Sequence, residues 1–524
     1  MALGSAQVQQ RFENPRDILG DRLKEGSIYR LLADHGHQMF GDEYFADLYA
    51  ESTKGRPTIP ARVMATVMVL QAFEGLSDRE ATDRLEVDLR WQAAAGVDTG
   101  YVAFHSTALV GQRNRLRASS RPRRLFEDTK MVAKETGAMK GRARVLDSTP
   151  IFDAVATEDT VTQLRASVRK LLTALEAAGS PLAAAVRASL LRDDDYATPG
   201  KPPCDWDDRA ARESLVDALV IDALAALSAL DGEEVPPTAI SAVDLVALVA
   251  GQDVEQGDDG IFRIVRKVAK DRVISTVDTE ARHGHKSRNR RFDGYKGHLS
   301  VDPDSELIDE VVATPANTPD RDAAVDLLAP VADDEDKPEV FGDSAYADGA
   351  TRDTLEEQGF TLTAKCPPVR NATGLFTKDR FVVDLEDSTV TCPAGQRVTI
   401  NPTRDGGGRA SFKVHCRTCP LRAACTKSRS GRTITVHPHE SILQRARADQ
   451  AKPGWAERYR ADRPIVERKI AHFVRRAWGG RNARTRGLKR IATDLDTRAG
   501  AINWARLAAL GLDHDGNGWV LGET

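Results

Sequence analysis

The stretch Arg144-Val-Leu-Asp-Ser-Thr-Pro-Ile-Phe-Asp153 is where the sequence first indicates both a fold and a chemistry. Val145 and Leu146 favour a strand, while Pro150 limits how far regular pairing can run. We therefore predict a buried strand that ends at Asp147 and points this carboxylate into a cleft as a catalytic group. The alternative is a turn or a helix cap, because Asp before Ser and Thr is common in both.

The bulk composition is typical of a soluble protein with several domains. The chain has 524 residues, of which 41% are hydrophobic and 29% are charged, and this length suggests about three or four domains. The sequence has no run of about eighteen apolar residues and no N-terminal basic segment followed by an apolar one. It therefore predicts neither a membrane span nor a signal peptide, and we expect a cytoplasmic protein.

Positive charge is concentrated in three segments, although the net charge is only −4. Residues 113–124 contain six arginines and no acid, and residues 282–296 contain six Lys or Arg and one Asp. Residues 463–490 contain ten Lys or Arg and one Glu. Clustered cations of this kind are candidate nucleic-acid surfaces, and a solvated basic face is the alternative at each of them.

The first 130 residues are predicted to form a helical domain. Apolar residues at helical spacing predict a helix over 59–73 that ends at Gly75, and Ser77 with Glu80 forms a capping box for the next helix. Two helices joined by a short turn outline a helix-turn-helix, although the periodicity alone favours an ordinary bundle. A third helix is expected to begin near Ser106. It carries the candidate DNA-binding residues Arg113, Arg115 and Arg117.

A long helical stretch at 159–270 separates the first strand from the others. It has no metal-ligand or nucleophile spacing, and we interpret it as an insertion that extends the surface over DNA or a partner subunit. Strand patterns return at 273–277, in a hairpin of 292–302 with 307–312, at 340–343 and at 360–364, with helices starting near 323 and 350. The order strand, hairpin, helix, strand, helix, strand is that of a ribonuclease H-like domain.

In this topology the first and fourth strands lie side by side, which would place Asp147 next to Asp343. Two adjacent carboxylates repel each other unless a cation lies between them. Mg²⁺ prefers oxygen ligands, and two such ions about 4 Å apart can bind both oxygens of a phosphoryl transfer. Glu467, in a predicted helix over 463–476, is the candidate third ligand, and an exposed Glu in surface ion pairs is the alternative.

Four of the six cysteines are clustered in the sequence, at Cys392, Cys416, Cys419 and Cys425. Thiolates at such spacings can complete a tetrahedral Zn²⁺ site, and His415, His437 or His439 could replace one of them. Four protein ligands leave no position for water, so the predicted zinc is structural and stabilises a small β-rich insertion. Unpaired structural cysteines are the alternative.

Several motifs are informative together. They are Asp147-Ser-Thr, Gly294-Tyr-Lys-Gly-His298, Thr314-Pro-Ala-Asn-Thr-Pro-Asp320, Gly342-Asp343-Ser-Ala-Tyr346 and Tyr459…Arg463…Glu467. With them, nearly the whole chain resembles a DDE transposase of a bacterial insertion sequence, more narrowly the group named for insertion sequence eleven-eighty-two. The resemblance implies that Asp147, Asp343 and Glu467 form the catalytic triad that binds two Mg²⁺ ions.

The chain departs from the family pattern near Glu467. The family has two residues between Tyr and Arg, and a Lys after six further residues beyond the Glu. Here three residues separate Tyr459 from Arg463, and Val474 stands at the position of the Lys. Arg475 or Lys469 is therefore the candidate for the basic contact.

The resemblance implies strand cleavage at the ends of the element, followed by attack of the freed 3′-hydroxyl on target DNA. The expected partners are double-stranded DNA, as terminal inverted repeats and target, and a second copy of the chain in a DNA-bound homodimer. The location would be the bacterial cytoplasm, with the nucleoid when DNA is bound. The candidate DNA-binding residues are Arg113, Arg115, Arg117, Arg288, Arg290, Arg291, Lys296, His298, Arg463 and Lys469.

Two other functions remain open. They are a ribonuclease H-like DNA nuclease and a catalytically inactive, zinc-stabilised DNA-binding protein. In each case we predict an α/β multidomain chain with an N-terminal helical, helix-turn-helix-like domain at 1–130. The ribonuclease H-like core would comprise 140–158, 271–375 and a C-terminal helical part at 441–524. It would be interrupted by the helical insertion at 159–270 and a Cys-rich zinc-binding β insertion at 376–440.

Overall fold

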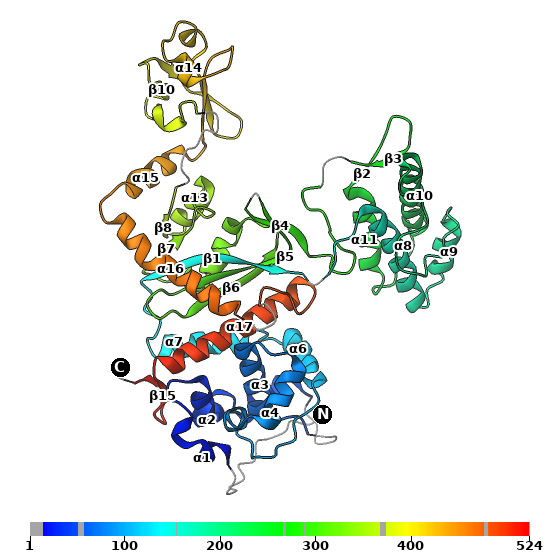
Figure 1. The fold of residues 1–524 in the computed structure, drawn as a ribbon, viewed down its shortest axis with the longest axis vertical. Helices are drawn as coiled ribbons and strands as arrows, with labels where there is room; N and C mark the ends of the chain where they lie inside the picture. Colours follow the sequence, from blue (N-terminus) through cyan, green and yellow to red (C-terminus); the bar gives the residue numbers. More distant parts are fainter. Residues whose placement is uncertain are drawn as a thin grey trace.

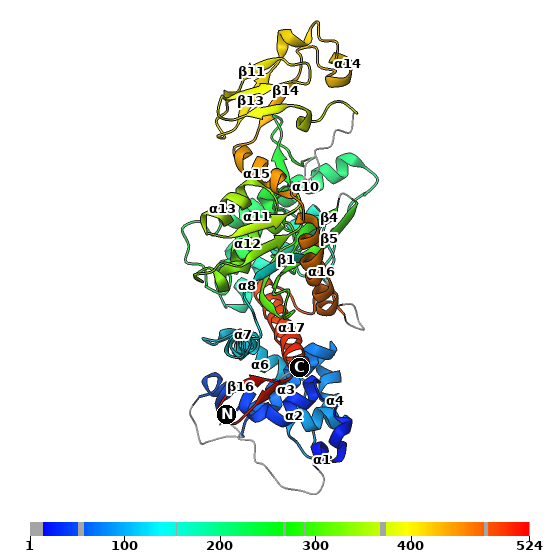
Figure 2. The ribbon, with the colours of Figure 1, turned by 90° about the vertical axis from the view of Figure 1, so that its left-hand side faces the viewer.

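The computed structural model describes residues 14–50, 57–153, 155–265, 269–287, 289–366, 374–475 and 480–522. A helical domain lies at one end, a mixed sheet in the middle, a helical lobe beside the sheet and a small β module at the other end (Figures 1 and 2). The predicted α/β multidomain class is therefore observed. The candidate DNA-binding residue Arg288 lies outside the described residues. None of the described helices combines the length and apolar character needed to cross a membrane.

The N-terminal domain is helical, as predicted. The helix expected over 59–73 is α3, it ends at Gly75 with φ 75°, and Ser77 and Glu80 form both bonds of the capping box. The helices are α1 (Pro15–Leu19), α2 (Ile28–Met39), α3 (Ala61–Glu74), α4 (Asp78–Val87), α5 (Leu89–Ala95), α6 (Thr107–Ala118) and α7 (Arg124–Glu135), with 3₁₀ turns η1 (Gly20–Arg22) and η2 (Asp42–Leu48).

The core of this domain includes a helix from the other end of the chain. Trp504 and Leu507 of α17 (Leu488–Ala509) are buried among the side chains of α2 and α3. The C-terminal hairpin of β15 (Leu512–His514) and β16 (Trp519–Leu521) packs against the same core. Figure 1 shows α17 lying between the helical domain and the central sheet. The two ends of the sequence therefore fold together.

The central sheet places its strands in the order β6–β5–β1–β7–β8, and β4 also pairs with β5. The strands are β1 (Ala143–Phe152), β4 (Arg282–Ser287), β5 (Arg290–Val301), β6 (Ile308–Pro315), β7 (Glu339–Gly342) and β8 (Thr361–Ala364). β1 is antiparallel to β5 and parallel to β7, and β7 is parallel to β8. The first strand and the strand before Asp343 are neighbours, as expected, and β5 and β6 form the expected hairpin.

Two expectations about strands are corrected. β1 does not end at Asp147 but continues to Phe152, because β5 pairs with it along this whole length. Residues 273–277 are not a strand. The side chain of Gln163 donates to the Val273 carbonyl at 2.9 Å, and that of Gln252 accepts from the Val273 N–H at 2.9 Å. Side chains thus satisfy backbone groups that a neighbouring strand would otherwise bind.

Helices cover the sheet and connect its strands. α12 (Ala324–Leu328) and α13 (Gly349–Glu357) follow β6 and β7, and the 3₁₀ turns η3 (Asp320–Ala323) and η4 (Ala329–Val331) flank α12. α15 (Glu440–Gln450) leads into α16 (Trp455–Phe473). Val466, Ile470 and Phe473 of α16 pack with Val145 of β1 and Leu299 of β5 in one hydrophobic core. This packing fixes the α16 helix against the strand that carries Asp147.

Two further units each have a core of their own. The helical lobe consists of α8 (Thr160–Ala177), α9 (Leu182–Ser189), α10 (Arg209–Ser228), α11 (Ile240–Gln252), β2 (Val254–Gln256) and β3 (Phe262–Ile264). The small β module has two three-stranded sheets around Phe381, Val390 and Phe412. Its elements are η5 (Lys378–Arg380), β9 (Val382–Asp384), β10 (Thr389–Thr391), β11 (Arg397–Thr399), β12 (Asn401–Pro402), β13 (Gly408–Ser411), η6 (Lys413–Cys416), α14 (Arg422–Cys425) and β14 (Thr433–Val436).

Candidate active site

Asp147 and Asp343 lie at the same offset on two adjacent parallel strands, Asp147 within β1 and Asp343 directly after β7. The last parallel pair of β1 and β7 joins Val145 to Phe341, and each carboxylate comes two residues later. Matched offsets on adjacent parallel strands bring the two side chains to the same part of the sheet. Burial raises the pKa of Asp147, and the charge of Asp343 raises it further, although the Arg463 guanidinium acts in the opposite direction.

Arg463 of α16 connects Asp147 to Glu467. Its Nη2 lies 2.9 Å from Asp147 Oδ2, and its Nη1 lies 3.5 Å from Glu467 Oε1, one helical turn further along. The Arg463 side chain is only 8% exposed, whereas that of Glu467 is 66% exposed. The same guanidinium therefore lies between two of the three predicted carboxylates.

Tyr459 holds α16 against the end of β7. Its hydroxyl donates to the Gly342 carbonyl at 3.1 Å, directly before Asp343. The Trp455 ring stacks on the Tyr459 ring with centroids 5.0 Å apart. This contact and the Arg463–Asp147 ion pair fix the helix to both acid-bearing strands, so the spacing of Tyr459, Arg463 and Glu467 along α16 has a structural basis.

A fourth carboxylate, Asp320, lies beside this site and was not among the predicted site residues. Asp320 accepts from the Ser148 hydroxyl at 2.8 Å and from Lys296 Nζ at 2.7 Å. The Tyr346 hydroxyl is buried without a hydrogen-bond partner in the described parts of the chain. Burial raises its pKa, and the charges of Asp320, Asp147 and Asp343 add to this. In the sequence, Asp320 was visible only as the acidic residue at the end of the motif Thr314–Asp320.

Two segments of the chain match family models. Residues 391–508 match a transposase DDE domain, and residues 17–115 match a transposase domain (DUF772). The matches support a DDE transposase. The DDE match includes α16 with Arg463 and Glu467, whereas Asp147 and Asp343 precede it in the chain. No curated protein and no solved structure matches the chain.

The three predicted catalytic side chains, Asp147, Asp343 and Glu467, are all carboxylates, and this donor chemistry suits a hard divalent cation. The Arg463 guanidinium shows that this place accepts a positive charge next to Asp147. Among the described residues, however, no three His, Cys, Asp or Glu side chains are gathered as a metal site. For all three carboxylates to bind a divalent cation, Glu467 would have to move towards Asp147 and Asp343. Arg463 would also have to release Asp147.

Four predicted DNA-binding residues have little exposed surface: Arg463, described above, and His298, Lys469 and Lys296. His298 is fully buried, its Nε2 lies 2.8 Å from the Thr314 hydroxyl, and burial lowers its pKa to about 4. Lys469 is 3% exposed and lies 3.3 Å from Glu306. Lys296 is mostly buried beside Asp320. Their side chains on inward-facing sides of β5 and α16 therefore offer little surface to DNA in this conformation. Arg290 and Arg291 are exposed at the start of β5.

The four clustered cysteines line one small cavity in the β module. Burial raises the pKa of the Cys425 thiol, Arg432 lowers it, and the other three thiols raise it further. His415 lines the same cavity, whereas His437 and His439 lie together next to Gly349 of α13. The expected grouping of the cysteines is observed, but their arrangement does not form a metal cluster within the described residues.

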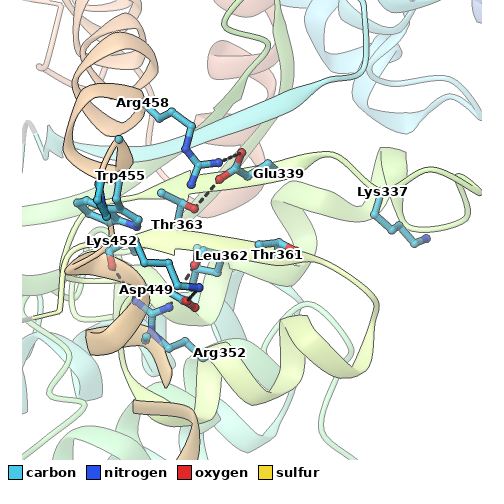
Figure 3. Close-up of a pocket in the computed structure, with 14 residues that line it drawn as sticks. Lys337, Glu339, Arg352, Thr361, Leu362, Thr363, Asp449, Lys452, Trp455 and Arg458 are labelled. Carbon is cyan, nitrogen blue, oxygen red and sulfur yellow. Dashed lines mark hydrogen bonds and ion pairs between the residues drawn. The ribbon is translucent and has the colours of Figure 1, made fainter. Parts of the chain in front are cut away.

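A larger cavity, of about 610 Å³, runs along the edge strand β8 and is lined by other charged side chains (Figure 3). Arg352 donates to the carbonyls of Leu362 at 3.1 Å and Ala364 at 2.7 Å, and so covers the strand edge. Arg458 pairs with Glu339 at 3.5 Å. None of the three predicted catalytic acids lines this cavity. Arg352, Lys452 and Arg458 have partners within it, whereas Lys337 donates to the Ala332 carbonyl.

Proposed function

We propose that this chain is a DDE transposase that binds the terminal inverted repeats of an insertion sequence and catalyses DNA strand cleavage and strand transfer. One observation carries the proposal: Arg463 contacts both Asp147 and Glu467, and Asp147 within β1 and Asp343 directly after β7 lie at matched offsets on parallel strands. Arg463 thus connects Asp147 to Glu467, and the parallel strands bring Asp147 and Asp343 to the same part of the sheet. The strand order β6–β5–β1–β7–β8 supports a ribonuclease H-like core.

We assign Asp147, Asp343 and Glu467 as ligands of two Mg²⁺ ions. When bound, these ions would neutralise the phosphate charge and lower the barrier to in-line attack by water or a 3′-hydroxyl. The protein itself positions the metal ligands: β1 and β7 hold the carboxylates of Asp147 and Asp343, and α16 supplies that of Glu467. Arg463 would then be available to hold a DNA phosphate, since it loses its contact with Asp147.

The finer assignments belong to the same proposal. The motifs support membership of the group of insertion sequence eleven-eighty-two. Exposed Arg290 and Arg291 are proposed DNA contacts on the β4–β5 hairpin, together with Arg117 of α6. Cys392, Cys416, Cys419 and Cys425 are proposed ligands of one structural Zn²⁺, since they surround one cavity. A homodimer would bind the two ends of the element together, in the cytoplasm.

A strand-transfer assay tests this function. The protein is incubated with Mg²⁺, a target plasmid and labelled duplexes that carry the two ends flanking its gene. Joined products are expected, and Asp147→Asn should abolish cleavage and joining while end binding persists. Cleavage without joining would favour a nuclease of the same fold. Binding without cleavage would favour a DNA-binding protein, and full cleavage by Asp147→Asn would refute the triad.

A further inference from the structure

A small cavity of about 130 Å³ lies between the N-terminal helices and α17. Four arginines line it, and we call it the arginine pocket: Arg113, Arg117, Arg484 and Arg490. Arg113 and Arg117 come from α6, while Arg484 and Arg490 come from the start of α17 and the segment before it. Two basic segments that are far apart in the sequence therefore meet in one place.

The acids of the arginine pocket are already engaged. Asp78 accepts from Arg113 at 2.5 Å and from the Gln71 side chain at 2.6 Å. Asp494 pairs with Arg498, outside the four arginines of the pocket, at 2.5 Å. The pocket thus has more positive charge than its own carboxylates neutralise.

Among the described residues, Arg117 and Arg490 are the arginines of the pocket that have no acidic partner. Across the described residues, no carboxylate oxygen lies within 4.0 Å of either guanidinium. In the part of the chain that the structure describes, the Arg117 guanidinium donates to the Asn114 side chain alone, and Arg117 is half-buried. Burial lowers the pKa of Arg117, and the charges of Arg490 and Arg113 lower it further. Such an uncompensated cluster is unfavourable by itself and becomes favourable when an anion binds.

The hydrogen-bonding groups of the pocket suit a phosphate. Guanidinium groups only donate hydrogen bonds, and a phosphate diester offers acceptor oxygens that match their fork geometry. The Thr485 hydroxyl also lines the pocket and is buried without a partner in the part of the chain that the structure describes. It can therefore donate to the same anion.

We propose that the arginine pocket binds one backbone phosphate of double-stranded DNA, with Arg117 and Arg490 as its principal contacts. This assignment rests on the proposed transposase function, because the anion is taken to be DNA. The other two arginines of α6 that the sequence predicts to bind DNA have different partners. Arg113 pairs with Asp78, and the Arg115 guanidinium lies 5.1 Å from the centre of the Tyr49 ring.

The pocket is mechanically linked to the strand that carries Asp147. Phe152 at the end of β1 exchanges backbone hydrogen bonds with residues 481 and 483, at 2.6 and 2.7 Å. Arg481 also donates to the Thr149 hydroxyl at 3.2 Å, two residues from Asp147. On the other side, Arg484 donates to the Leu76 carbonyl at 2.6 Å. A phosphate held here would fix the DNA relative to both the N-terminal helices and the candidate active site.

The salt dependence of DNA binding tests the pocket. Affinity for a labelled linear duplex of mixed sequence is measured over a range of KCl concentrations for the full chain and for Arg117→Ala combined with Arg490→Ala. Loss of one phosphate contact should weaken binding and reduce the slope of log K against log[KCl] by about 0.9. The midpoint of thermal unfolding should stay equal or rise, because two repelling charges are removed.

The matched control is Arg187→Ala on α9, which removes one exposed arginine from the helical lobe. It should leave the slope unchanged. An unchanged slope and affinity in the double variant, with normal DNA binding by the parent chain, would overturn the pocket and leave the transposase proposal standing. If the double variant lowers the slope of log K against log[KCl] but the parent chain never joins DNA strands, the arginine pocket is supported and the proposed transposase function is refuted. A parent chain that does not bind duplex DNA would refute both.

Discussion

The Arg463 guanidinium lies 2.9 Å from the Asp147 carboxylate; the Arg463 side chain is 8% exposed and that of Asp147 is 17% exposed. Asp147 is partly buried, and burial raises its pKa, so a nearby positive charge favours its ionised form. Arg463 supplies that charge in the DNA-free chain. A divalent ion at the triad would compete with this guanidinium for the same carboxylate oxygens.

Replacing Arg463 by Gln should therefore tighten divalent-ion binding while it impairs DNA chemistry. Two charges 4 Å apart interact by about 4 kcal/mol at an effective dielectric constant of about 20, so at least a tenfold increase in Mn²⁺ affinity is expected. Titration calorimetry on the DNA-free protein measures it. Arg460→Gln is the control, because Arg460 is 71% exposed on the same helix. Equal Mn²⁺ affinity in parent and Arg463→Gln would contradict the competition.

Asp320→Asn should slow strand cleavage without unfolding the protein. Asp320 holds the Ser148 hydroxyl and the Lys296 ammonium next to the triad, and its charge acts on Tyr346. Loss of such supporting contacts commonly lowers activity about 10- to 100-fold. Cleavage rates at saturating Mg²⁺ measure the effect, with Asp322→Asn as the exposed control two residues away. If Asp320→Asn cleaves at the parent rate, this carboxylate has no part in the site.

Local sequence patterns predicted the parts of the site that local forces determine. The capping box at Ser77 and the β5–β6 hairpin follow from spacing that is visible in the sequence. The pairing of the strands near Asp147 and Asp343 was predicted from the order of the elements instead. The relation between Arg463 and Glu467 also follows, because residues four apart share a helix face.

Contacts between distant segments were not predictable in the same way. The alternation around His298 did not show which side of β5 faces the core, and the structure buries this residue. Asp320 was noted only as the end of a turn motif, since its bond to Ser148 spans 172 residues. The insertion of α17 into the N-terminal core likewise depends on packing between the two ends of the chain.

The β module should carry one Zn²⁺ if its four thiols act together. Cys416→Ser is expected to remove the metal and to lower the thermal stability of the module, because its small core has few other contacts. Metal analysis of the purified chain and proteolysis after chelation measure this. Cys204→Ser is the control, since Cys204 lies in the helical lobe. A metal-free parent chain whose module resists protease equally with and without chelator would rule out the zinc.

Asp496 should make the stability of the chain fall as the pH rises. Burial raises its pKa from 3.8 to about 7; Arg123 opposes this, and Glu310 and Glu127 add to it. The folded chain therefore binds this proton more tightly than the unfolded chain. The stability that this bound proton gives to the folded chain is fully present below about pH 4 and is lost as the pH rises through 7.

Asp496→Asn keeps the shape and removes the charge. The variant should be more stable than the parent at pH 8 by about 2 kcal/mol and show a flatter profile between pH 4 and 7. Thermal unfolding at several pH values measures the difference. Identical profiles for the two proteins would mean that Asp496 stays ionised beside Arg123.

Gly500 should be intolerant of even one added carbon. It lies in α17 where this helix crosses α7, and an added Cβ would lie 2.3 Å from the Leu125 carbonyl oxygen and 2.9 Å from the Leu125 carbonyl carbon. Both atoms are backbone, so the two helices would have to separate. Gly500→Ala is therefore expected to destabilise the fold by about 1–3 kcal/mol, although Ala favours a helix over Gly.

Gly251 provides the matched comparison for this helix crossing. It is also helical, in α11, but an added Cβ would have no neighbour within 4 Å. Gly251→Ala should leave the midpoint of thermal unfolding unchanged or raise it slightly, because only the helix propensity changes. Opposite shifts in the two variants would support the close contact of α17 with α7. A Gly500→Ala variant as stable as Gly251→Ala would show that α17 is not held against α7 at this distance.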